Sequence, residues 1–195
     1  MEPGRLALWR RFRVSYIFKL WKNYEGAKDE FVYIYSHDEE SAYKISDQMV
    51  LARVPKSEIK DWKTYTYFAG YKSGKPVWSE DVRKRQRVFV NPEKCYRSGV
   101  SYNEGLKRYL WCQIIPLFTG EELQGPRFKG GLGIFESETP WGSRETAFYS
   151  VDWDIGPGET ASIPPRWISS DGKTCYYLFS GDDCFSVRKM TFTTD

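Results

Sequence analysis

The stretch TCYYLFSGDDCFSVRKM, from Thr174 to Met190, decides the fold, because it predicts two β-strands joined by a tight polar corner. Its first part alternates aromatic with smaller residues, as strands with one buried face do. Ser-Gly-Asp-Asp favours a turn, and FSVRKM leads away as the second strand. Upstream, RWIS (Arg166–Ser169) predicts another strand, and Asp171-Gly172 predicts a type I′ hairpin turn.

The same pattern occurs near the start of the chain. FVYIY (Phe31–Tyr35) and QMVLARV (Gln48–Val54) flank a polar corner, and TYTYFAG (Thr64–Gly70) follows as a further strand. LWKNY (Leu20–Tyr24) comes before them, separated by the turn-like EGAKDE. These segments predict four strands in meander order.

Two further copies follow. VSY, RYLWCQII (Arg108–Ile115), GGLGIFES (Gly130–Ser137) and ETAFYSV (Glu145–Val151) predict a second four-stranded meander. The third copy opens with TASIP and ends with FSVRKMTF, without a fourth strand. The pattern therefore occurs about two and three-quarter times.

Repeated four-stranded meanders without a predicted helix are typical of a β-propeller, in which each meander forms one blade. The repeat is longer than the roughly 40–50 residues of common propellers, and its extra residues lie in loops. A β-sandwich is the alternative, but its strands would not repeat in register. We predict an all-β, partial β-propeller with blades at about 16–75, 85–151 and 158–195, after an unmatched basic segment at 1–15.

Composition limits the classes of partner. The chain has 195 residues with 17% aromatic and 28% charged residues, which argues for a folded domain. Its net charge is only +3, and the densest basic run, Lys84–Arg87, has the pattern of a solvated loop, so we predict no nucleic-acid partner. No apolar run approaches the roughly 20 residues of a membrane span, and no signal peptide is predicted.

The cysteines do not predict a metal centre. Cys95, Cys112, Cys175 and Cys184 lack Cys-x-x-Cys spacing, and the chain has one histidine, so we predict no metal and no cofactor. Cys95 and Cys112 flank a predicted hairpin, which leaves open either a disulfide between them or buried, reduced thiols. The compartment stays undetermined by this pattern.

Several segments together resemble a known family. They are NYEGAKDEFVYIYSHD, QMVLARVP, CYRSGVSYNEGLKRYLWCQ, ETPWGSRET, GPGETASIPPRWISSDGKT and YYLFSGDDCFSVRKM. The chain resembles, from about Lys22 to Thr193, microbial proteins of the domain of unknown function 4185 and, more distantly, the five-bladed propeller glycoside hydrolases such as family 43. The resemblance implies a propeller related to glycosidases, some of which cleave arabinan-type polysaccharides and are secreted. It also implies a C-terminal, partial copy without the N-terminal blades.

Propeller topology predicts where a site lies. With the strands of a blade named A to D, the loops from D to the next A and from B to C open on one face, around the central channel. The residues at these loops are His37 and Asp38 in the first blade, Tyr96, Arg97, Ser98 and Gln113 in the second, and Glu159, Thr160, Ser162, Asp182 and Asp183 in the third. We expect them to surround one pocket.

Glycoside hydrolysis needs two carboxylates, a general acid and a base or nucleophile. Glu159 is the candidate acid, and Asp38, Asp182 and Asp183 compete for the partner role. Arg97 could hold a carboxylate ionised or bind a sugar hydroxyl. The candidates for substrate contact are Tyr96, Arg97, Ser98, His37, Thr160 and Ser162. The alternative is that the acidic residues only satisfy backbone N–H groups at turns.

Two functions remain open from the sequence. The first is a glycoside-hydrolase-like propeller that acts on or binds a polysaccharide, with carboxylates at the channel mouth. The second is a non-catalytic carbohydrate-binding or interaction propeller, or an inactive fragment. A nucleic-acid or membrane binder has only the Lys84–Arg87 run and the basic N-terminus in its favour.

Overall fold

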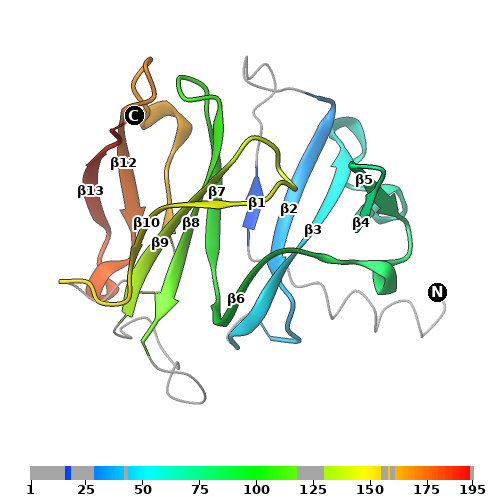
Figure 1. The fold of residues 1–195 in the computed structure, drawn as a ribbon, viewed down its shortest axis with the longest axis horizontal. Helices are drawn as coiled ribbons and strands as arrows, with labels where there is room; N and C mark the ends of the chain where they lie inside the picture. The colour runs from blue at the N-terminus through cyan, green and yellow to red at the C-terminus, as the bar shows by residue number, and fades with distance from the viewer. Residues whose placement is uncertain are drawn as a thin grey trace.

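The computed structural model describes residues 16–18, 29–41, 44–117, 130–154, 158 and 161–193. Within these ranges the chain forms three antiparallel β-sheets and short 3-10 helices, with no α-helix. The sheets follow one another across the molecule in chain order (Figure 1). This arrangement is that of a partial β-propeller, and it confirms the predicted fold class.

The first sheet has six strands. They are β1 (Tyr16–Phe18), β2 (Phe31–His37), β3 (Ser46–Pro55), β4 (Thr66–Lys72), β5 (Lys75–Ser79) and β6 (Arg87–Cys95). The order is β1-β2-β3-β4-β5, and β6 also pairs with β3. β4 pairs with β3 at Ala52 and Arg53, whereas β6 pairs with it between Ser46 and Val50, so two strands share one edge of β3. The strand expected at 20–24 lies outside the described residues.

Short 3-10 helices connect the outer strands of this sheet. They are η1 (Lys56–Glu58), η2 (Trp62–Thr64) and η3 (Val82–Lys84). Asp61 and Asp81 cap η2 and η3, because their carboxylates accept hydrogen bonds from the backbone N–H groups of Lys63 and Arg83. No helix in the described part of the chain is long and apolar enough to cross a bilayer.

The second sheet is a four-stranded meander. It contains β7 (Ser98–Asn103), β8 (Arg108–Pro116), β9 (Gly130–Ser137) and β10 (Glu145–Ser150), in the order β10-β9-β8-β7. β8 is buried on both faces, since successive side chains of a strand point to opposite sides. Tyr109 and Trp111 pack toward the first sheet, whereas Leu110, Cys112 and Ile114 pack toward the third.

The third sheet has three strands, β11 (Ala161–Ser162), β12 (Thr174–Phe179) and β13 (Ser186–Thr191). The strand predicted at Arg166–Ser169 is wrong, because the 3-10 helix η5 (Pro165–Trp167) begins at a proline, which favours a helical first turn over a strand. The type I′ turn is also wrong, because that turn needs a positive φ at both Asp171 and Gly172, and of these two residues only Gly172 has one, 74°. The Gly172 N–H instead donates a 2.8 Å hydrogen bond to Ser169 O. The polar corner is confirmed as η6 (Gly181–Asp183).

The four cysteines are free thiols in the structure, so Cys95 and Cys112 form no disulfide. They lie in different hydrophobic clusters. Cys95 belongs to the cluster between the first and second sheets, and Cys112 lies with Cys175 between the second and third. Burial raises the pKa of the Cys95 thiol to about 12 and that of Cys175 to about 11, which keeps both protonated at neutral pH.

Candidate functional site

The predicted site residues that the structure describes lie at one end of the sheets. β2, β8 and β12 finish at this end, and β3 and β7 begin there, at the lower side of Figure 1. An antiparallel meander returns to the same end with every second strand, so B-to-C and D-to-A loops meet there. We call this region the corner end of the sheets.

His37 is the last residue of β2 and is 1% exposed. Its Nε2 lies 2.8 Å from Ser41 O, and its ring centroid lies 6.2 Å from that of Tyr96. Burial lowers the imidazole pKa from its usual 6.5, and the nearby Arg97 cation lowers it further against the opposing effect of the Ser41 carbonyl. His37 is therefore a neutral imidazole at pH 7.

This burial predicts that stability falls on acidification. Because the folded-state pKa is below the unfolded value, the unfolded chain binds more protons, and the free energy of unfolding falls as pH drops below 6.5. The slope for one proton is at most about 1.4 kcal/mol per pH unit. His37 is the only histidine in the sequence. His37→Gln should therefore reduce the pH dependence of the free energy of unfolding, measured by urea unfolding between about pH 7 and 5. An unchanged slope in the variant would contradict the assignment.

Arg97, Tyr96 and Ser98 follow β6 and open β7. The guanidinium carbon of Arg97 lies 5.8 Å from the Tyr96 ring centroid, and Ser98 Oγ donates a 2.8 Å hydrogen bond to Tyr96 O. Ser98 pairs with Gln113 of β8. Tyr96, Ser98 and Gln113 are buried, whereas Arg97 is partly exposed. Of these four residues, Arg97 is the one that reaches the surface, and the Tyr96 ring is not open to stacking.

Ser162 is brought to the same place by a close approach of two strands. A Cβ atom added to Gly99 of β7 would lie 2.3 Å from Ala161 O and 3.1 Å from Ser162 Cα of β11. Only glycine leaves room for this contact between backbones. The start of the third sheet is thereby held against the start of the second.

Glu159 and Thr160 lie outside the described residues, whereas Gly158, which directly precedes them, is described. Gly158 is buried with φ +72°, and a Cβ added to it would lie 2.2 Å from Ser180 O. Ser180 immediately precedes η6, which contains Asp182 and Asp183. Gly158 therefore lies against the residue that precedes the acidic corner of the third sheet, where the Asp182 side chain is exposed.

Asp38 has a different environment from the other predicted carboxylates. Its Oδ1 accepts hydrogen bonds from Arg85 Nη2 at 2.6 Å and Nε at 3.0 Å, and its Oδ2 accepts one from Gln48 Nε2 at 2.7 Å. The side chains of Asp38 and Arg85 are 15% and 19% exposed. These contacts tie the β2–β3 corner to the loop before β6, so a catalytic role for Asp38 would require some of them to break.

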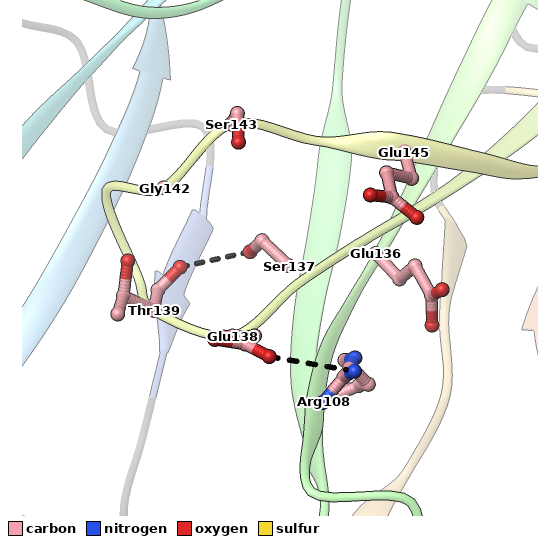
Figure 2. Close-up of a pocket in the computed structure, with 8 residues that line it drawn as sticks. All are labelled: Arg108, Glu136, Ser137, Glu138, Thr139, Gly142, Ser143 and Glu145. Atoms are coloured by element: carbon pink, nitrogen blue, oxygen red, sulfur yellow. Dashed lines mark hydrogen bonds and ion pairs between the residues drawn. The ribbon is translucent and has the colours of Figure 1, made fainter.

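A second polar site, which sequence reasoning missed, lies away from the corner end. It is a pocket of about 250 Å³ beside the β9–β10 corner (Figure 2). Its lining residues are Arg108, Glu136, Ser137, Glu138, Thr139, Gly142, Ser143 and Glu145. These residues come from three strands and one loop, and the strand register that unites them is not visible in a single sequence. Among the described residues, no three His, Cys, Asp or Glu side chains are grouped to hold a metal ion.

Comparisons with known proteins support the fold. No protein-family model matches the sequence, and no curated protein matches it, so the resemblance to the domain of unknown function 4185 stays a prediction. The structure is similar to an exo-β-1,3-galactanase from Phanerochaete chrysosporium solved with β-1,3-galactotriose, with a TM-score of 0.53 and 12% identity over 86% of this chain and 35% of that one.

A second similar structure is an exo-β-1,3-galactanase from Clostridium thermocellum, with a TM-score of 0.52 and 13% identity over 87% of this chain and 36% of that one. The chain thus spans about a third of the length of these two enzymes. At such identity the likeness concerns the fold alone. Over the part that it spans, the chain shares its fold with the β-propeller glycoside hydrolases of family 43.

Proposed function

We propose that the corner end binds a carbohydrate, so that the chain acts as a glycoside-hydrolase-like propeller on an oligosaccharide or polysaccharide. The observation that carries this proposal is the contact of Gly99 with Ala161 and Ser162. It gathers Arg97, Ser98 and Ser162 from two sheets. The Arg97 guanidinium and the Ser162 hydroxyl supply the donors and the acceptor that sugar hydroxyls need.

The exposure of these groups assigns them different tasks. Arg97 and Ser162 are partly exposed, so they are the groups that meet the ligand. His37, Tyr96 and Ser98 are buried behind them and hold the loop before β7 in place through the bond from Ser98 Oγ to Tyr96 O and the ring contact between His37 and Tyr96. A site that rests on buried polar contacts keeps its ligand-binding groups in fixed positions.

Arg97→Ala tests the binding proposal. A hydrogen bond from a charged donor contributes about 1.5–3 kcal/mol, so its removal should weaken glycan binding roughly ten- to 150-fold. The measurement is isothermal titration calorimetry against β-1,3-galacto-oligosaccharides and arabinan oligosaccharides. Arg83→Ala is the matched control, since Arg83 lies on the surface of η3 paired with Asp81 at 2.8 Å. A wild-type chain that binds no glycan, or an Arg97 variant that binds equally well, would contradict the proposal.

Hydrolysis is the second candidate, and the contact of Gly158 with Ser180 favours it. Gly158 directly precedes Glu159 in the chain, and Ser180 directly precedes the corner with Asp182 and Asp183. Glycosidases place two carboxyl groups about 5–9.5 Å apart around the bond that breaks. In this proposal Glu159 protonates the leaving oxygen, and Asp182 or Asp183 acts as the base that activates water or as the nucleophile.

Glu159→Gln separates hydrolysis from binding. Losing a general acid should reduce the rate of glycan hydrolysis about 10²–10⁴-fold, whereas the isosteric amide should leave binding within a few-fold of wild type. Product release is measured by chromatography and binding by calorimetry on the same oligosaccharide. A variant that hydrolyses at the wild-type rate would contradict the acid role, and a wild type that binds without hydrolysing would leave the non-catalytic function.

A further inference from the structure

The pocket beside the β9–β10 corner has a lining without any apolar side chain. Pockets for ordinary small molecules are mostly hydrophobic, with a few polar groups that orient the ligand. This one offers carboxylates, a guanidinium and the hydroxyls of Ser137, Thr139 and Ser143. Its volume of about 250 Å³ would hold about eight water molecules. A lining of this kind suits one compact, heavily hydroxylated group.

Two glutamates that line the pocket are direct cross-strand neighbours. Glu136 of β9 and Glu145 of β10 are partners in the strand register, so their side chains project from the same face of the second sheet. Residues directly opposite in an antiparallel pair have Cβ atoms about 4.5–5.5 Å apart, and like charges there are destabilising. Glu136 and Glu145 are thus like-charged cross-strand neighbours in the lining of one pocket.

The cation in the pocket pairs with the third carboxylate, that of Glu138. Arg108 Nη2 lies 3.5 Å from Glu138 Oε1, and Arg108 Nη1 donates to Lys107 O at 3.3 Å. In Figure 2 a dashed line joins Arg108 to Glu138, and none reaches Glu136 or Glu145. Within the described part of the chain, the carboxylates of Glu136 and Glu145 have no hydrogen-bond or ion-pair partner. The pocket therefore has three carboxylates against one guanidinium, and two of the three are available to a ligand.

We propose that this pocket binds an amine-bearing sugar, a 2-amino-2-deoxyhexose with its ammonium group between Glu136 and Glu145. The ammonium supplies three donors and the positive charge that the opposed carboxylates lack. The ring hydroxyls face Thr139, Ser143 and the Arg108–Glu138 pair, which provide both donors and acceptors. This site is separate from the corner end and does not depend on the function proposed there.

The test compares ligands that differ only in the nitrogen. Glucosamine, N-acetylglucosamine and glucose are titrated into the ¹⁵N-labelled chain, and amide shifts around β9 and β10 are followed by NMR. We expect saturable shifts with glucosamine and at least tenfold weaker binding of the other two. Glu136→Gln and Glu145→Gln should each remove glucosamine binding, while Glu80→Gln, at an exposed glutamate outside the pocket, should leave it intact.

The same variants give a second readout in the absence of ligand. Glu136→Gln and Glu145→Gln each relieve the repulsion, so both should unfold at a higher urea midpoint than wild type, and Glu80→Gln should not. Equal binding of glucose and glucosamine, equal binding of a simple alkylamine, or retained binding in both variants would overturn the proposal. Arg97→Ala should not change glucosamine binding, so failure here is distinguishable from failure at the corner end.

Discussion

Trp111→Ala is expected to lower the free energy of unfolding by about 3–5 kcal/mol, the range for large aromatic truncations in a packed core. Trp111 is 0% exposed in the middle of β8, where the first and second sheets pack together. The centroid of its ring lies 4.9 Å from that of the Tyr35 ring of β2, in an edge-on contact, and 5.3 Å from that of the Phe89 ring of β6. Alanine would remove all of these contacts and leave a cavity that two rigid sheets cannot close.

A second loss adds to the cavity. The Arg144 guanidinium carbon lies 4.2 Å from the Trp111 ring centroid, and Arg144 also donates to Pro140 O and Ser137 Oγ, both at 2.9 Å. Without the indole, the half-buried Arg144 cation loses the aromatic face that it packs on. We therefore place Trp111→Ala toward the upper part of the range.

The measurement is urea unfolding followed by circular dichroism. Trp62→Ala is the matched control, because Trp62 is 41% exposed on η2 and should cost less than about 1 kcal/mol. If both tryptophan variants shifted the midpoint equally, Trp111 would not be the centre of the interface between the first two sheets.

Gly99→Ala is expected to cost about 3 kcal/mol, at the upper end of what overpacking usually costs. The added methyl would lie 2.3 Å from Ala161 O, and a backbone carbonyl cannot rotate away as a side chain can. To make room, β11 must move away from β7. That movement separates Ser162 from Arg97 and Ser98, so glycan binding at the corner end should weaken together with stability.

Gly142→Ala is the matched control for this clash. There the added Cβ would be 2.7 Å from Thr139 Oγ1, a hydroxyl that can turn aside, and its next neighbour is 3.6 Å away. We expect less than about 1 kcal/mol of destabilisation in urea unfolding. A Gly99 variant as stable as this control, with unchanged glycan binding, would show that the approach of β7 to β11 does not hold the site together.

Local patterns were sufficient to predict most strands. The alternation in Phe31–Tyr35, Arg108–Ile115 and Thr174–Phe179 reflects side chains that point to opposite faces, and each of these segments is a strand. The prediction failed at Arg166–Ser169, where a short apolar run has no periodicity that separates a strand from a helical turn. The pair Pro164-Pro165 was the signal that could have corrected it.

The sequence could not predict that β4 and β6 pair with different parts of the same edge of β3. Both strands follow β3 in the chain, so either could have paired along that whole edge. Each has a sequence compatible with pairing, and long-range contacts select the arrangement. For the same reason the predicted four-strand meander describes the second sheet but not the first.

The sequence by itself determined the strand class and the meander of the second sheet, because alternation and turn chemistry are local properties of the chain. Tertiary structure alone decided which polar groups reach the surface there, and it set Glu136 opposite Glu145 around a second pocket. Those outcomes depend on strand register and on how closely sheets approach. Both are fixed by packing between residues far apart in the chain.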